Sequence, residues 1–263
     1  MSQAPHIVKS YSKELQQLRD LISEMGGLVE NQVALATQAI VEGDPALAAL
    51  AVEQDPAVDA LERKAEQLVI TMLALRQPMA ADLRSVVAAL KITAALERIG
   101  DYAKNVAKRS IVLGQFRLPF ALTAIAAMAR LVQENLRLVI DAASEDDPDK
   151  AIQVWRSDEA IDDLYNSIFR ELVTYMMEDA RNITPCTHLL FIAKNLERMG
   201  DHATNIAEHI HYAITAKVLS EERPKGAGTA YAIVRPPEAA VLADGGSASG
   251  GPGFGGSTSG GDE

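Results

Sequence analysis

The sequence predicts an all-α protein made of two antiparallel three-helix bundles in tandem, followed by a disordered Gly/Ser-rich C-terminal tail. Three observations support this prediction. Apolar residues recur with the helical period, no comparable period-2 pattern indicates strands, and a twelve-residue motif occurs twice. The composition agrees, because 48% of the residues are hydrophobic and only 5% aromatic, and the prominent Ala, Leu, Glu and Lys favour helices.

Glycine and proline residues divide the chain into long apolar-periodic segments. The second segment contains Asp55-Pro56, where proline removes a backbone donor and the preceding Asp is a natural N-cap, so we expect this helix to be broken with a short first piece. Long helices joined by short loops are typical of antiparallel bundles. The expected helices span about residues 10–42, 45–76, 79–113, 118–144, 148–180 and 184–219.

The chain contains an internal repeat. LERIGDYAKNVA at Leu96 to Ala107 recurs as LERMGDHATNIA at Leu196 to Ala207, with eight of twelve positions identical. The match extends backward, since Asp44-Pro45 corresponds to Asp147-Pro148. Residues from Arg223 onward hold 11 of the 17 glycines and cannot form a core. The sequence thus predicts a first bundle at 1–115, a second bundle at 116–220 and a tail at 221–263.

Composition and motifs argue against several classes of function. The net charge of -11 disfavours nucleic acid and anionic lipid as partners. The start lacks a secretory signal, and no apolar stretch is long enough to span a bilayer, so we expect a cytoplasmic protein without membrane insertion. Cys186 is the only cysteine and is expected to be a buried hydrophobe. No phosphate loop or nucleophile elbow occurs, so we expect no enzyme activity.

Acidic pairs lie in both copies of the motif. Glu97 and Asp101 are four residues apart, as are Glu197 and Asp201, so each pair projects from one helix face. A similar pair precedes each motif on the neighbouring expected helix. If the helices are antiparallel and the pairs face each other, each half gathers four carboxylates, which suits Fe, Mn, Mg or Zn. The candidate metal ligands are Asp55, Asp59, Glu97, Asp101, Asp158, Asp162, Glu197 and Asp201.

Other interpretations of these residues remain open. The acidic pairs lie beside the apolar stripe, and Asp55 and Asp158 are also suited to capping helices. Gly100 and Gly200 interrupt helical segments, where a glycine costs roughly 1 kcal/mol relative to alanine. Such a glycine permits the close approach of a ligand or, equally, close helix packing without a ligand.

A di-metal oxidase or metal-storage bundle is a competing hypothesis, and a purely structural helical scaffold is another. Glu208-x-x-His211 has the Glu-x-x-His spacing of di-iron bundles. The equivalent stretch of the first half runs from Lys108 to Ile111 and lacks both ligands. Because di-iron chemistry normally needs two such motifs, this difference counts against an oxidase.

The segment RQPMAADLR at Arg76 to Arg84, followed by LERIGDYAKNVA and later by NLERMGDHATNIAE, resembles the PhoU family over roughly residues 10–218. The resemblance implies two three-helix bundles, frequent homodimers, and multinuclear iron or zinc clusters at E/D-x-x-x-D motifs in some members. The eight carboxylates named above occupy those motif positions. Two departures are Pro56, which directly follows Asp55, and the Gly/Ser-rich tail, which has no place in the family core.

The resemblance also implies a function. Proteins of this family are expected to be non-enzymatic adaptors that negatively regulate high-affinity phosphate uptake and phosphate-starvation signalling. The implied partners are the ATPase subunit of the phosphate ABC transporter and the phosphate-sensing histidine kinase. Because an acidic surface repels free phosphate, we do not expect phosphate itself to be the direct ligand.

Overall fold

The computed structural model describes residues 4–116, 118 and 122–219, and the fold within them is helical. The predicted Gly/Ser-rich tail lies outside the described residues. A 3₁₀ turn at Ala180–Asn182 leads into the last helix. The α-helices are α1 (Ala4–Glu42), α2 (Pro45–Glu53), α3 (Asp55–Arg76), α4 (Ala81–Leu113), α5 (Thr123–Glu145), α6 (Pro148–Glu178) and α7 (Ile183–Thr215).

Local sequence explains where the helices of each repeat begin. Asp44 caps α2 by accepting a hydrogen bond from the Ala46 amide at 2.8 Å, and Asp147 caps α6 in the same way. A proline follows each cap at the first helical position, where no backbone donor is needed. The predicted break is confirmed, because α2 and α3 are separated at Gln54, immediately before Asp55-Pro56.

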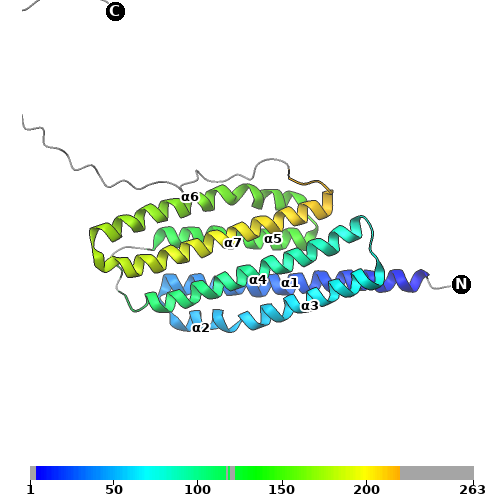
Figure 1. The fold of residues 1–263 in the computed structure, drawn as a ribbon, viewed down its shortest axis with the longest axis horizontal. Coiled ribbons are helices and arrows are strands. Elements are labelled where there is room, and N and C mark those ends of the chain that lie inside the picture. The colour runs from blue at the N-terminus through cyan, green and yellow to red at the C-terminus, as the bar shows by residue number, and fades with distance from the viewer. Residues whose placement is uncertain (1–3, 117, 119–121, 220–263) are drawn as a thin grey trace, which may run out of the picture. The chain divides into compact units, whose positions relative to one another are not determined.

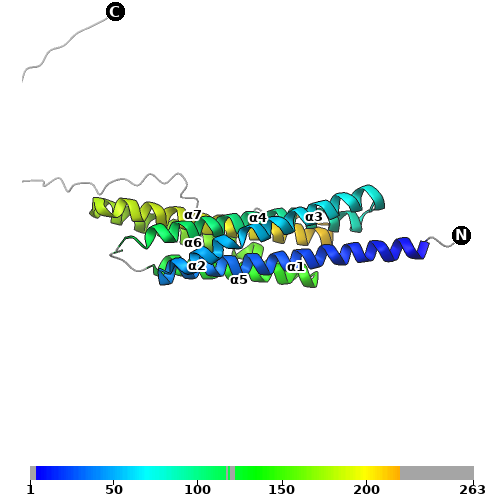
Figure 2. The same ribbon diagram turned by 90° about the horizontal axis from the view of Figure 1, so that it is seen from below.

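Each repeat forms a three-helix bundle. The first consists of α1, the broken helix α2–α3, and α4, and the second consists of α5, α6 and α7. Helices α3, α4, α7 and α6 lie side by side in that order (Figure 1). Figure 2 shows α1 and α5 on the other side of α4 and α7, which they contact. The all-α tandem-bundle fold predicted from the sequence is therefore confirmed.

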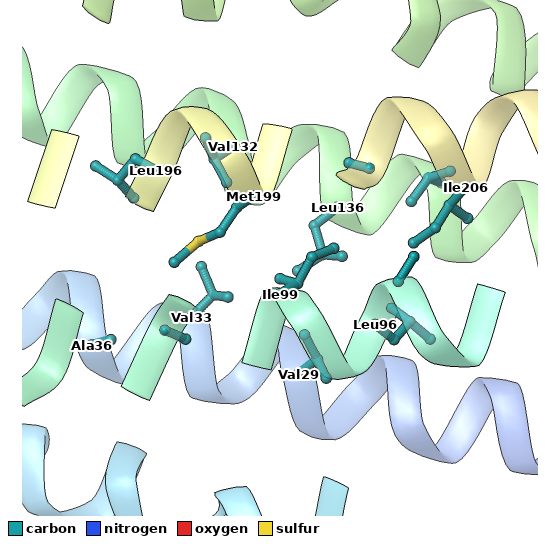
Figure 3. Close-up of a cluster of buried hydrophobic side chains, with 14 of the residues drawn as sticks. Val29, Val33, Ala36, Leu96, Ile99, Val132, Leu136, Leu196, Met199 and Ile206 are labelled. Carbon is teal, nitrogen blue, oxygen red and sulfur yellow. The ribbon is translucent and has the colours of Figure 1, made fainter. Parts of the chain in front are cut away.

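The two bundles share their core. Figure 3 shows Val29 of α1, Ile99 of α4, Leu136 of α5 and Met199 of α7 pointing toward one another, and all four are buried. Interlocking apolar side chains from both repeats bury area that neither bundle covers alone. The seven α-helices of the described residues accordingly belong to one compact unit. The bundle boundaries at 115 and 220 stay a prediction.

Within the described residues, no helix is both long enough and apolar enough to traverse a lipid bilayer.

Candidate functional site

The two motif copies lie next to each other at the centre of the α3–α4–α7–α6 layer. Helices α4 and α7 are antiparallel, because Arg109 near the end of α4 lies 3.4 Å from His188 near the start of α7. The equivalent residues Tyr102 and His202 meet midway, with ring centroids 5.7 Å apart. Each motif therefore presents one side to its twin and the other to a neighbouring helix, α3 for the first copy and α6 for the second (Figure 1).

A lysine bridges the carboxylates of the first acidic row. Lys104 Nζ donates to Asp55 at 2.7 Å and to Asp101 at 2.6 Å, which joins the start of α3 to the middle of α4. Burial by itself would lower the pKa of Lys104, but the hydrogen bonds to Asp101 and Asp55 outweigh burial and raise the pKa above its usual range. The predicted approach of Asp55 and Asp101 is seen, with an ammonium group between them.

The rest of the first row is rich in negative charge. Burial and the neighbouring charge of Asp101 raise the pKa of Glu97, with Glu62 and Asp59 contributing further. Burial, Glu66 and Asp59 likewise raise the pKa of Glu62. The row therefore gathers the four predicted carboxylates and adds Glu62, which lies one turn after Asp59 and was not predicted.

The second acidic row has a different internal partner. Asp158 is only 2% exposed and accepts a hydrogen bond from Thr204 Oγ1 at 3.1 Å. Thr204 occupies the position equivalent to Lys104, so a hydroxyl replaces the ammonium group of the first row.

Glu197 of the second row is paired with a lysine on its own helix. Lys194 Nζ donates to Oε1 of Glu197 at 2.7 Å and lies 2.7 Å from Oε2. Burial raises the pKa of Glu197, Lys194 opposes this effect, and Asp201 and Asp162 reinforce it. All four predicted carboxylates of the second half thus belong to one row along α6 and α7.

The rows do not fit a metal cage as they are placed. Among the described residues, no three His, Cys, Asp or Glu side chains are gathered in positions that could hold a metal ion. In the first row, Lys104 fills the space between Asp55 and Asp101 that a cation would occupy. Iron or zinc binding by the eight carboxylates stays a prediction from the sequence.

Sequence reasoning missed the two lysines and Thr204. A local signal existed for the lysines, because Lys104 follows Asp101 by three residues and Lys194 precedes Glu197 by three. The contact between Lys104 and Asp55 spans 49 positions of sequence and requires the fold.

The two motif glycines permit close side-chain packing. A Cβ atom at Gly100 would lie 3.0 Å from Gln32 Oε1 and 3.5 Å from Val58. At Gly200 it would lie 2.7 Å from Ile161 Cδ1. Val58 and Ile161 are equivalent residues of the two repeats, so the glycines serve the same packing contact twice. Of the two interpretations left open by the sequence, these contacts favour helix packing without a ligand.

The capping interpretation of the acidic pairs is wrong for Asp158, which lies inside α6. Asp55 is the first residue of α3 and bonds to Lys104, whereas Gln54 occupies the N-cap. The Glu-x-x-His pair does not converge either. Glu208 accepts from the Trp155 indole at 3.2 Å, while His211 Nδ1 lies 3.0 Å from the Lys217 carbonyl.

Cys186 is buried as predicted, and burial raises the pKa of its thiol.

Both halves of the chain match one family of domains. The PhoU domain matches residues 22–110, within the first bundle, and again residues 125–210, within the second. The chain belongs to the PhoU family. A protein from Caulobacter vibrioides named phosphate-specific transport system accessory protein PhoU homolog is 52% identical over 221 residues, covering 84% of this chain and 96% of its own. A protein of the same name from Rhizobium meliloti is 48% identical, covering 84% of this chain and 93% of its own.

Solved structures of PhoU proteins share the fold. The crystal structure of PhoU from Pseudomonas aeruginosa superposes with a TM-score of 0.77 at 38% identity, over 79% of this chain and all of the other. The phosphate transport system regulatory protein PhoU from Streptococcus pneumoniae gives 0.73 at 28% identity, over 80% of this chain and all of the other. The family membership predicted from the two motif copies is confirmed, and this PhoU-family chain is similar to accessory proteins of phosphate transport.

Proposed function

We propose that this PhoU-family chain is a non-enzymatic cytoplasmic regulator of phosphate homeostasis. In this proposal it negatively regulates high-affinity phosphate uptake and phosphate-starvation signalling. It does so by linking the ATPase subunit of the phosphate ABC transporter to the phosphate-sensing histidine kinase. The observation that supports the proposal most is the 52% identity to a protein named phosphate-specific transport system accessory protein PhoU homolog, over 84% of this chain and 96% of that protein.

Features of the fold are consistent with an adaptor. The α3–α4–α7–α6 layer presents a broad face with two acidic rows, and an adaptor needs such a face for more than one partner. Neither row contains an arrangement of nucleophile and base typical of an enzyme.

Deletion of the gene tests the regulatory proposal. We expect phosphate-starvation reporters to stay active in high phosphate after deletion and to be repressed again when the full chain is supplied from a plasmid. The empty plasmid is the control. Normal repression in the deletion strain would reject the regulatory role.

Metal binding and homodimerisation are part of the proposal. A chain with Glu97, Asp101, Glu197 and Asp201 all changed to Ala is expected to lose iron or zinc, measured by elemental analysis after mild purification, while circular dichroism stays helical. Unchanged metal content in this variant would exclude these carboxylates as ligands. Sedimentation equilibrium of the wild-type chain tests the dimer.

A further inference from the structure

A row of cations runs along the junction of α4 and α7, between the two acidic rows. Arg84, Lys91 and Arg98 of α4 are spaced seven residues apart, about two helical turns, and so lie on one stripe. Arg109 continues the stripe, and Arg198 of α7 lies across from it with its guanidinium carbon 5.8 Å from the Tyr102 ring centroid. We call these five residues the basic seam. It is a local concentration of positive charge on a chain whose net charge is -11.

A small cavity opens at one end of the basic seam, between the first turns of α4 and the last turns of α7. Its volume is about 220 Å³. Leu83, Val87 and Tyr212 form its apolar walls, and these side chains are 40%, 37% and 43% exposed. Sites for drug-sized ligands hold about 300–1,000 Å³. The cavity is therefore of the size for one or two apolar side chains.

Two cations of the seam stand beside this cavity without a balancing acid. Within residues 11–116, 118 and 122–219, neither Arg84 nor Lys91 forms an ion pair with a carboxylate. Burial and the nearby charge of Lys91 lower the pKa of His209, which also lines the cavity. His209 is therefore harder to protonate than a free imidazole, and the positive charge beside the cavity is carried by Arg84 and Lys91.

We propose that the α4/α7 end cavity and the basic seam bind an acidic amphipathic helix of a partner protein. An apolar side chain of that helix fills the cavity between Val87 and Tyr212, and its carboxylates pair with Arg84 and Lys91. The proposed contact stays at this end of the seam, because Arg98, two turns further along the stripe, already pairs with Glu97 at 3.6 Å and with Asp101 at 3.8 Å. This proposal rests on the adaptor function and names the surface and chemistry of one partner.

The lining favours a peptide over free inorganic phosphate. Phosphate sites in proteins bring several donors to one point, as at a helix N-terminus or an arginine fork. Here the lining holds two cations, Arg84 and Lys91, and is otherwise mostly aliphatic and aromatic carbon, which would remove water from a phosphate without replacing its hydrogen bonds. An apolar anchor flanked by carboxylates matches both the carbon walls and the two cations.

Fluorescence anisotropy tests the proposal with the full chain. The probe is a fluorescein-labelled amphipathic peptide of roughly 18 residues with Leu on one face and Glu on the other. We expect saturable binding that weakens as NaCl is raised, and about tenfold weaker binding for both Lys91→Glu and Arg84→Glu. Lys64→Glu on the exposed face of α3 makes the same charge change away from the seam and is expected to bind as the wild type does.

Further variants and competitors test the cavity wall, the sign of the peptide charge and binding of free phosphate. Val87→Asp is expected to weaken binding through the cavity wall, and circular dichroism of every variant checks that the helices are kept. A peptide with Lys in place of Glu should not bind. Equal binding by Lys91→Glu and Lys64→Glu, or displacement of the peptide by inorganic phosphate beyond that caused by NaCl of the same ionic strength, overturns the proposal. The anisotropy assay measures binding at this surface, whereas the reporter test measures regulation by any surface of the protein. Failure of the peptide to bind therefore rejects the docking site without rejecting the regulatory function.

Discussion

Lys104 and Thr204 occupy equivalent positions of the two motifs but form different contacts with the acidic rows. The ammonium group of Lys104 joins Asp55 to Asp101, while the hydroxyl of Thr204 lies 3.1 Å both from the buried Asp158 and from the Gly200 carbonyl. A partly buried carboxylate that loses its partner keeps its desolvation penalty, which is larger than the net value of the hydrogen bond it had. In the first row Lys104 is therefore the group that links α3 to α4, whereas Arg63 and Arg98 pair with acids of their own helices.

Replacing Lys104 with Met is expected to lower the free energy of unfolding by roughly 1–3 kcal/mol at pH 7. The pKa of Lys104 is raised in the folded protein, so its stabilisation is present below its unfolded pKa of about 10.4 and lost as the pH rises further. Urea unfolding followed by circular dichroism measures the change. Lys108→Met on the exposed side of α4 is the control, and equal stability of the two variants would contradict the bridge.

For Glu197, the effect of its charge on stability is opposite to that of Lys104. Its pKa is raised, so ionising it opposes folding above the folded-state pKa, and the penalty disappears below the unfolded pKa of about 4.3. Glu197→Gln is therefore expected to raise the free energy of unfolding at pH 7.5, with the gain shrinking to nothing as the pH falls toward 4. The exposed Glu159→Gln should show no such trend in urea titrations at the same pH values. A gain that is independent of pH would rule out burial of the charge as its cause.

At the scale of elements, patterns predicted the helices better than their ends. The break at Gln54 follows from Asp55-Pro56, and the absence of a break in α6 follows because Asp158 precedes Glu159 instead of proline. Helix α4 was expected from 79 but begins at Ala81, after Gln77 and Ala80, which have φ of 47° and 49°. Helix α7 was expected to reach 219 but ends at Thr215, because Ala216 has φ of 58°. Positive φ can be predicted from sequence mainly at Gly or Asn, and residues such as Gln77, Ala80 and Ala216 give no such signal.

The crossing of α6 and α7 depends on Gly200. Alanine there gains roughly 1 kcal/mol of helix propensity, but overpacking a buried contact costs about 1–3 kcal/mol. Because the added Cβ would lie 2.7 Å from Cδ1 of the buried Ile161, we expect Gly200→Ala to destabilise the protein. Ile161→Val removes Cδ1, so the double variant should be more stable than the sum of the single changes predicts. Additive changes in urea unfolding would show that the contact does not limit the packing.

At the scale of the whole molecule, the repeat predicted two bundles but not how they associate. The apolar stripes that include Leu96 and Leu196 predict which helix faces are buried, but they do not predict which helix covers each face. The structure shows α1, α4, α5 and α7 covering one another across the repeats. The same limit applied to the acidic rows, where spacing found the carboxylates and only the fold revealed the lysine between two of them.

A shared core predicts that the two bundles unfold together. Trp155 is the only tryptophan, lies in α6 of the second bundle and is 4% exposed, so its fluorescence reports the second bundle alone. Leu96 lies in α4 of the first bundle and is 1% exposed. Leu96→Ala is expected to lower the free energy of unfolding by about 2–5 kcal/mol. The Trp155 transition in urea should shift by the same amount as circular dichroism, which reports all helices. Leu50→Ala, at a site 48% exposed, should shift neither. A Trp155 transition unmoved by Leu96→Ala would show that the bundles unfold independently despite their common core.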